Sequence, residues 1–156
     1  MCEKDRVIAY LLRTGKTVAV AESCTGGMLA KIFTDYPGIS SVFTEGIVTY
    51  ANEAKIRMGV RTETIERFGA VSPETAREMA EAIRKRTGAD ITVSTTGIAG
   101  PGGGTERKPV GLVYVGICWD GKTKTFALRL SGDRDTIRKK TVQAIFHFLS
   151  GELEGL

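Results

Sequence analysis

The apolar residues of this chain follow two patterns that take turns along the sequence. Short runs rich in β-branched residues predict buried strands, whereas longer segments with apolar residues three or four positions apart predict amphipathic helices. Turn residues between these segments set their approximate bounds. We predict helices over residues 3–14, 26–35, 53–58, 73–87 and 133–149, and strands over residues 17–22, 42–50, 90–95, 110–119 and 122–130.

Local signals define several of these ends. Ser72 is a predicted N-cap with Pro73 in the first helical position, and Gly88 ends the same helix. Asn52 is the predicted cap of the short helix that follows it. Asp120-Gly121 predicts a hairpin between the last two strands.

The order of the elements predicts the fold class. Strands and helices alternate at first, and a hairpin follows. We therefore expect an α/β fold, with residues 1–156 forming a single three-layer α/β/α sandwich. Its sheet should be mixed and mostly parallel, with one antiparallel strand.

Composition narrows the class of protein and its surroundings. With 156 residues, of which 42% are hydrophobic and 26% charged, the chain is typical of one soluble globular domain. It has no apolar run of ~18 residues, no signal-peptide pattern and only three scattered cysteines. We therefore expect a cytoplasmic protein with no membrane partner and no metal. The net charge is +4, and the basic residues are spread over several segments, so nucleic-acid binding has little support and we expect no nucleic-acid partner. The same charge is equally consistent with attraction for a phosphorylated small molecule.

Ser23 occupies the most informative position in the chain. It follows the predicted strand 17–22 and precedes Thr25-Gly26-Gly27, a turn into a helix. There its hydroxyl lies close to unpaired N–H groups that can hold an oxyanion, as a nucleophile requires. Capping the turn is the stronger interpretation of Ser23 considered alone. Cys24 is a competing nucleophile, but neighbouring residues point in different directions, so only one of the two can face the site.

A nucleophilic serine needs a base, and the only histidine is poorly placed. His147 lies on its helix opposite the apolar stripe, which predicts a solvated position and argues against a Ser–His–Asp triad. Lys55 lies in the first turn of a helix, where the helix dipole and burial would lower its pKa toward neutrality. Tyr50 precedes that helix and could relay or orient a proton. Alternatively, Lys55 is an ordinary surface lysine and Tyr50 a packing residue.

A Gly-rich segment, residues 96–105, follows the third predicted strand. It matches neither the P-loop nor the dinucleotide-binding fingerprint. Glycines nevertheless let backbone N–H groups approach a ligand closely, and a connection of this length within one domain is more often functional than a flexible turn. Because Ser23, Tyr50 and this segment each follow a predicted strand, parallel strands would bring all three to one edge of the sheet.

Five segments of the chain together resemble one known family, the C-terminal domain of CinA, also called the PncC-type nicotinamide-nucleotide amidohydrolases. They occur in order over essentially the whole chain, at residues 21–27, 46–55, 69–72, 96–104 and 108–111. The resemblance implies a three-layer α/β/α sandwich. It also implies the deamidation of nicotinamide mononucleotide to nicotinate mononucleotide and ammonia.

The resemblance also implies roles for individual residues. Ser23 matches the family nucleophile, and Tyr50 and Lys55 match the residues that activate it. The substrate-binding residues implied by the resemblance are Thr25, Gly26, Thr96, Gly97, Gly102, Gly103 and Arg134.

The implied mechanism uses neither a metal nor an organic cofactor, and amides around residues 24–27 hold the oxyanion. We expect a nucleotide substrate and a homo-oligomer. Many CinA proteins carry a further N-terminal domain, and we expect this chain to be the stand-alone amidase type. The alternative function is a nucleotide-binding or regulatory module without catalysis, related to competence or DNA damage.

Overall fold

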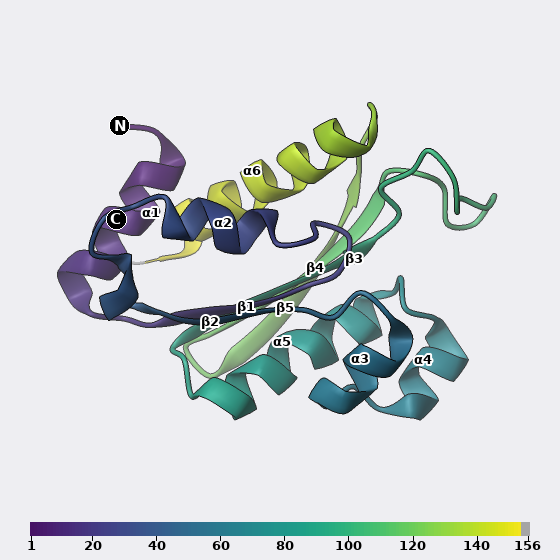
Figure 1. The fold of residues 1–156 in the computed structure, drawn as a ribbon, viewed down its shortest axis with the longest axis horizontal. Helices are drawn as coiled ribbons and strands as arrows, with labels where there is room; N and C mark the ends of the chain where they lie inside the picture. Colours follow the sequence, from purple (N-terminus) through teal and green to yellow (C-terminus); the bar gives the residue numbers. More distant parts are fainter. Residues whose placement is uncertain (154–156) are drawn as a thin grey trace.

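The computed structural model describes residues 1–153, in which helices cover both faces of a central five-stranded sheet (Figure 1). In chain order its elements are α1 (Glu3–Thr14), β1 (Val18–Glu22), α2 (Met28–Thr34), the short 3-10 helix η1 (Ile39–Ser41), β2 (Phe43–Val48), α3 (Asn52–Met58), α4 (Thr62–Phe68), α5 (Pro73–Thr87), β3 (Ile91–Gly97), β4 (Leu112–Trp119), β5 (Lys122–Arg129) and α6 (Arg134–Glu152).

The strands are arranged in the order β2-β1-β3-β4-β5. β1 pairs in parallel with β2 and β3, whereas β4 pairs antiparallel with both β3 and β5. Only β4 therefore runs against the other strands of this sheet. The predicted mixed sheet with one antiparallel strand is confirmed.

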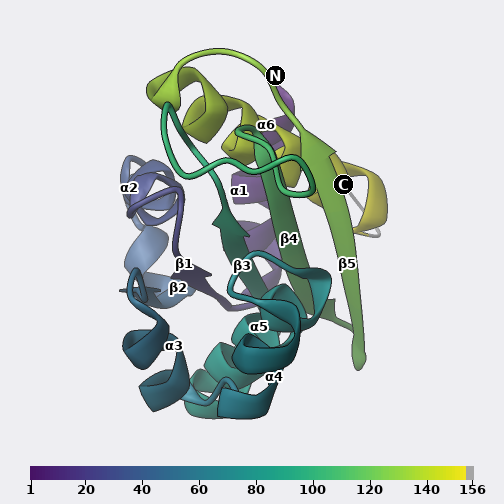
Figure 2. The same cartoon turned by 90° about the vertical axis from the view of Figure 1, so that its right-hand side faces the viewer.

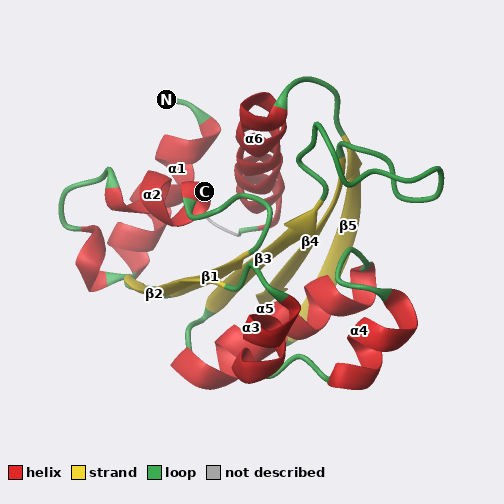
Figure 3. Cartoon of the chain, turned by 45° about the vertical axis from the view of Figure 1, so that its right-hand side comes forward, coloured by secondary structure: helices red, strands yellow, loops and turns green. Residues whose placement is uncertain are grey.

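The layers explain the continuous apolar run of β1. Helices α1, α2 and α6 lie on one face of the sheet, and α3, α4 and α5 lie on the other (Figures 1 and 3). Val18 and Val20 belong to the larger core on the first face, while Ala19 and Ala21 pack on the second. Because β1 is buried on both faces, its sequence does not alternate between apolar and polar residues.

Two of the turn and cap predictions are confirmed in detail. The Ser72 hydroxyl accepts a hydrogen bond from Thr75 N at 3.2 Å, as an N-cap should. Asp120 and Gly121 form the β4–β5 hairpin with φ values of 49° and 72°. Positive φ at both central positions is what a two-residue hairpin turn requires.

Three predictions of detail were wrong. Asn52 does not cap α3 but is its first residue, and Ala51 occupies the N-cap position. Helix α4 was not predicted, because its segment contains only two large apolar residues, Ile65 and Phe68. Strand β3 continues to Gly97, since Thr96 and Gly97 still pair with residues of β4.

Candidate active site

The three parallel strands end at the same edge of the sheet, and the predicted site residues follow their ends. Ser23 comes directly after β1, Tyr50 lies two residues after β2, and Thr96 and Gly97 end β3. Figure 2 turns this edge toward the viewer. The Gly-rich connection, residues 98–111 between β3 and β4, crosses it. The strand order β2-β1-β3 therefore brings the candidate segments together, as the sequence predicts.

Ser23 and Lys55 form a buried pair at this edge. The Lys55 ammonium nitrogen, Nζ, lies 3.0 Å from Ser23 Oγ. It lies 2.8 Å from the carbonyl oxygen of Thr49 and 3.1 Å from that of Tyr50. Lys55 is 1% exposed and Ser23 is 8% exposed. Lys55 is therefore not a surface lysine, and the three oxygens fix the position of its amine.

Burial shifts the ionisation of Lys55 in the direction that a base requires. Desolvation lowers the pKa of Lys55 below the ordinary value of a lysine, because the charged form loses its hydration. In the neutral form, two N–H groups of the amine can donate to the carbonyls of Thr49 and Tyr50. The nitrogen lone pair is then directed at Ser23 and can accept the proton of its hydroxyl.

Cys24, the competing nucleophile, faces the core. Its side chain is buried in the cluster on the α2 side of the sheet. Burial raises the pKa of the Cys24 thiol to about 11, so the thiol is protonated at neutral pH. Ser23 and Cys24 thus point in different directions, as their adjacency predicts.

Tyr50 contributes its backbone to the Ser23–Lys55 pair, while its ring lies outside. The side chain is 54% exposed, and its hydroxyl accepts a hydrogen bond from Arg134 Nη2 at 2.5 Å. Arg134 Nη1 donates to the carbonyl of Gly100 at 2.7 Å. Arg134 therefore connects the first turn of α6 to both Tyr50 and the Gly-rich connection, close to the predicted site.

The hydroxyls of two predicted substrate-binding residues are engaged within the protein. Thr25 Oγ1 donates to Glu22 Oε1 at 2.6 Å and lies 2.7 Å from Thr95 Oγ1. Thr96 Oγ1 donates to the carbonyl of Ala70 at 2.7 Å. Both threonines are buried. Their side chains therefore hold the site in place, which leaves their backbone groups for any contact with a ligand.

The predicted glycines fall into two groups. A Cβ on Gly97 would lie 2.7 Å from the carbonyl oxygen of Leu112, so packing of β3 against β4 excludes a side chain there. A Cβ on Gly26, whose φ is +60°, would lie 3.2 Å from the Arg138 guanidinium. Gly102 and Gly103 are exposed at the tip of the Gly-rich connection. Close packing therefore gives a reason for glycine at positions 97 and 26, but not at positions 102 and 103.

The Gly-rich connection is anchored on both sides of its exposed tip. Arg134 contacts Gly100 on one side, as described above. On the other side, Lys108 Nζ donates to the carbonyl of Phe68 at 2.7 Å. This contact ties the connection to the end of α4. The segment that carries the exposed Gly102 and Gly103 is therefore fixed at both ends.

Sequence reasoning missed a buried carboxylate beside Ser23. Glu22 is 1% exposed and accepts hydrogen bonds from Leu29 N at 2.9 Å and from Ala30 N at 3.0 Å. The N–H groups of Leu29 and Ala30 are thus occupied by Glu22, and that of Met28 donates to the carbonyl of Thr25, so none of the three can hold an oxyanion. An acidic residue that ends an apolar strand a few residues before a helix was the available signal, since a buried carboxylate must find donors.

Thr49 carries an unusual hydroxyl. Among residues 1–153, Thr49 Oγ1 is the one buried side-chain oxygen or nitrogen without a hydrogen-bond partner. The side chain is 2% exposed, and the carbonyl of the same residue holds Lys55. A buried hydroxyl without a partner costs free energy, so this position is a direct target for mutation.

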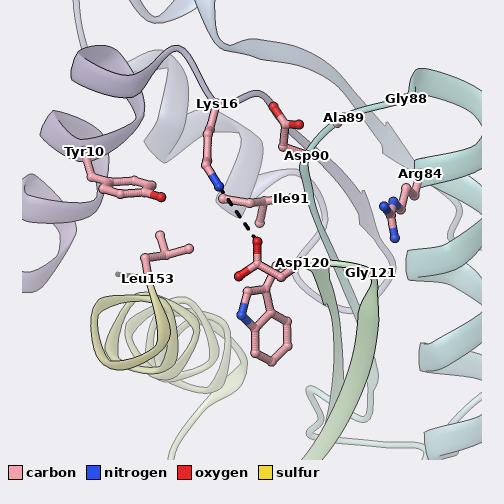
Figure 4. Close-up of a pocket in the computed structure, with 11 residues that line it drawn as sticks. Tyr10, Lys16, Arg84, Gly88, Ala89, Asp90, Ile91, Asp120, Gly121 and Leu153 are labelled. Carbon is pink, nitrogen blue, oxygen red and sulfur yellow. Dashed lines mark ion pairs between the residues drawn. The ribbon is translucent and has the colours of Figure 1, made fainter. Parts of the chain in front are cut away.

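A separate cavity of about 360 Å³ lies at the opposite edge of the sheet (Figure 4). Its lining includes the Lys16–Asp120 ion pair, at 3.8 Å, and the start of β3. The described residues that line it include none of the candidate site residues. Within residues 1–153, no cluster of three His, Cys, Asp or Glu side chains could hold a metal ion, and no helix is long and apolar enough to cross a membrane.

The predicted position of the single histidine is confirmed. His147 is exposed on α6, and its Nδ1 lies 2.8 Å from Glu3 Oε1. Ile145 and Phe146 beside it are buried in the core. His147 therefore lies on the outer side of α6 with a partner from α1, and a Ser–His–Asp triad with Ser23 has no support.

The fold and site define a class of three-layer α/β/α domains with a buried serine–lysine pair at the carboxyl edge of parallel strands. The model of the CinA C-terminal domain family matches residues 3–153. The chain belongs to this family. The resemblance drawn from the sequence motifs and the fold predicted from them are both confirmed.

Relatives and solved structures agree with this membership. The chain is 55% identical to a competence-damage inducible protein of Clostridium acetobutylicum over 98% of this chain and 38% of that protein. A relative of the same description from Clostridium perfringens is 57% identical over 96% of this chain and 37% of that protein. The chain thus spans less than two fifths of the length of these relatives.

Among solved structures, the competence/damage inducible protein CihA from Agrobacterium tumefaciens has a TM-score of 0.92 and 42% identity. The match covers 96% of this chain and 92% of that one. The competence damage-inducible protein A from Klebsiella pneumoniae has a TM-score of 0.93 and 34% identity, with 98% and 96% of the two chains covered.

Proposed function

We propose that this chain is an amidase that hydrolyses the carboxamide of nicotinamide mononucleotide to nicotinate mononucleotide and ammonia. The observation that carries the proposal is the 3.0 Å contact between Ser23 Oγ and Lys55 Nζ in a buried setting. A serine becomes a nucleophile when an adjacent base accepts its proton, and a neutral lysine amine can do so. The resemblance of the motifs to nicotinamide-nucleotide amidohydrolases supports the choice of substrate.

In the first half of the reaction, the neutral amine of Lys55 takes the proton of the Ser23 hydroxyl. Ser23 Oγ forms a bond to the carboxamide carbon, and the carbonyl oxygen becomes an oxyanion. In the described part of the chain, the N–H groups of Thr25 and Gly27 have no internal partner and are the candidates to hold it. The C–N bond then breaks, and the Lys55 ammonium returns its proton to the leaving amine, which departs as ammonia.

In the second half, water replaces ammonia. Lys55, again neutral, accepts a proton from water, and the resulting hydroxide attacks the ester carbon on Ser23. Collapse of the second tetrahedral intermediate breaks the bond to Ser23 Oγ, which regains a proton from Lys55. The net reaction consumes one water and releases the acid and ammonia. Within residues 1–153, the Tyr50 hydroxyl is bonded to Arg134 rather than to Ser23 or Lys55, so the proposed proton path is direct.

The nucleotide part of the substrate accounts for the surroundings of the pair. Arg134 uses one N–H of each terminal nitrogen for Tyr50 and Gly100, and further N–H groups remain for a phosphate. The exposed glycines at 102 and 103 lie on the same connection and offer backbone N–H groups. Binding energy from the ribose phosphate would orient the reacting amide.

An ammonia-release assay with nicotinamide mononucleotide tests the proposal. Wild type should release ammonia and nicotinate mononucleotide in equal amounts, and Ser23→Ala should release none while remaining folded. Cys24→Ala is the matched control, because it changes the adjacent residue and should retain most of the activity.

Two results would contradict the proposal. An inactive Cys24→Ala enzyme together with an active Ser23→Ala enzyme would indicate thiol chemistry. A wild-type chain that binds the nucleotide without releasing ammonia would favour the non-catalytic nucleotide-binding module.

A further inference from the structure

The carboxylate of Glu22 holds the turn that carries Ser23. Both oxygens of Glu22 are engaged: Oε1 accepts from Thr25 Oγ1 at 2.6 Å and from Leu29 N at 2.9 Å, and Oε2 accepts from Ala30 N at 3.0 Å. These donors lie on both sides of residues 26 and 27. Glu22 therefore closes a ring of contacts around the whole turn between β1 and α2.

Thr95 on the neighbouring strand fixes the same turn from the side. Its carbonyl accepts from Ser23 N at 2.9 Å, and its hydroxyl lies 2.7 Å from Thr25 Oγ1. Thr25 thus links Glu22 to Thr95, and all three residues are buried. This arrangement fixes the backbone of Ser23 relative to β3 and relative to α2.

The arrangement determines which backbone N–H groups remain available. An α-helix begins with N–H groups that lack partners, and such groups attract anions. In α2, Glu22 occupies those of Leu29 and Ala30. An external anion is therefore excluded from the start of α2, while the N–H groups of Thr25 and Gly27 in the turn have no internal partner within residues 1–153.

We propose that Glu22 is the positioning residue of the nucleophile, acting through Thr25 to hold Ser23 toward Lys55 and to keep the turn N–H groups free for an oxyanion. The inference rests on the proposed role of Ser23 as the nucleophile. It adds that the catalytic geometry depends on a carboxylate on the far side of the turn, which does not itself touch substrate.

Glu22→Gln is the appropriate perturbation. The substitution keeps the shape of the side chain but replaces one oxygen by an NH2 group, which cannot accept from a backbone N–H. Only one of the two terminal atoms of residue 22 can then accept hydrogen bonds, so part of the turn loses its contact with that residue. Glu45→Gln is the matched control, because Glu45 is a partly exposed residue of β2 whose ion pair with Arg86 lies on the surface.

The readout is the rate at which phenylmethylsulfonyl fluoride modifies Ser23, followed by intact-protein and peptide mass spectrometry. In this reaction Ser23 Oγ forms a bond to sulfur, fluoride leaves, and the serine proton is released. The probe contains no nucleotide, so it reports on the nucleophile and the turn alone. Thermal unfolding of each variant is measured in parallel, and labelling is done well below the midpoint.

We expect Glu22→Gln to be labelled on the order of 10 to 100 times more slowly than wild type while folded, because small displacements of a nucleophile have effects of this size. With nicotinamide mononucleotide, kcat should fall and KM should stay close to wild type. Glu45→Gln should match wild type in labelling rate.

Thr25→Ser and Thr25→Val provide a second pair, which serves even if Glu22→Gln does not fold. Thr25→Ser keeps the hydroxyl that links Glu22 to Thr95. It should be labelled on the order of 10 times faster than Thr25→Val, which lacks that hydroxyl. Wild-type labelling in folded Glu22→Gln, or in Thr25→Val, would overturn the inference.

This test separates the two proposals. A wild-type chain that is labelled at Ser23 but releases no ammonia would end the amidase proposal and leave the positioning role intact. A wild-type chain that is not labelled at Ser23 would overturn the positioning role, because the nucleophile it is built on would be absent.

Discussion

Replacement of Lys55 by methionine is the mutation whose consequences the structure defines best. Methionine has a similar length, but it removes the amine that lies 3.0 Å from Ser23 Oγ and contacts the carbonyls of Thr49 and Tyr50. Loss of a general base costs about 10²- to 10⁴-fold in rate. At 1.36 kcal/mol for each factor of ten, this corresponds to about 3–5 kcal/mol of transition-state stabilisation.

The pH profile identifies the group that is lost. Only the neutral amine of Lys55 can accept the serine proton, so wild-type kcat/KM should rise with pH as Lys55 loses its own proton. Desolvation lowers the pKa of Lys55, so this rise should occur below the ~10.4 of a free lysine. Lys55→Met should lose both the activity and this ionisation. Steady-state kinetics across a range of pH provide the measurement.

Lys55→Arg is the decisive companion variant. Arginine keeps a positive charge but does not deprotonate at working pH. We expect it to be nearly inactive. Near-normal rates in Lys55→Arg would refute the reasoning, because Lys55 would then supply only charge and another group would have to act as the base.

The remaining predictions concern stability and binding. Because the pKa of Lys55 is lowered in the folded state, the folded state binds fewer protons than the unfolded state. The free energy of unfolding of wild type should therefore rise with pH between the pKa of Lys55 in the folded state and ~10.4. Urea titrations should show this rise in wild type and not in Lys55→Met. Thr49→Val removes a buried hydroxyl that has no partner within residues 1–153. The substitution should stabilise the fold by about 1–3 kcal/mol, and each kcal/mol should raise Tm by about 2–4 °C. A lower Tm in calorimetry would show that the hydroxyl has a hydrogen-bond partner in solution. Arg134→Met should raise KM for nicotinamide mononucleotide at least tenfold with a smaller effect on free nicotinamide, and equal changes for both compounds would contradict a role in holding the phosphate.

The parts of the fold that depend on local pattern were predictable. The apolar run of β1, the Ser72 cap and the Asp120-Gly121 turn each have one dominant physical cause, which is burial on both faces, satisfaction of a helix N–H or a positive φ. The pairing of Ser23 with Lys55 was also predictable, because parallel strands bring their carboxyl ends together. Helix α4 lacks such a pattern, since its position is set by contacts with α5, including the one between Thr64 and Glu78.

The parts of the site that depend on the direction of a side chain were not predictable. The sequence indicates that Thr25 and Thr96 lie near the site, but the structure directs their hydroxyls toward Glu22 and Ala70. The burial of Glu22 follows from its parity on β1 and from the helix that begins a few residues later. The sequence shows the acid at the end of an apolar strand, but only the folded turn shows that the N–H groups of Leu29 and Ala30 reach its carboxylate. Tertiary contacts of this kind decide between a ligand-binding and a supporting role.

The most direct test of the account is to trap the covalent intermediate that it requires. Wild-type protein is mixed with nicotinamide mononucleotide, quenched in acid within the first turnover, digested and examined by peptide mass spectrometry. The account predicts the acyl group of nicotinate mononucleotide on the peptide that contains Ser23, together with released ammonia, and its absence from Ser23→Ala. An adduct on Cys24, or ammonia released by the Ser23→Ala protein, would contradict it.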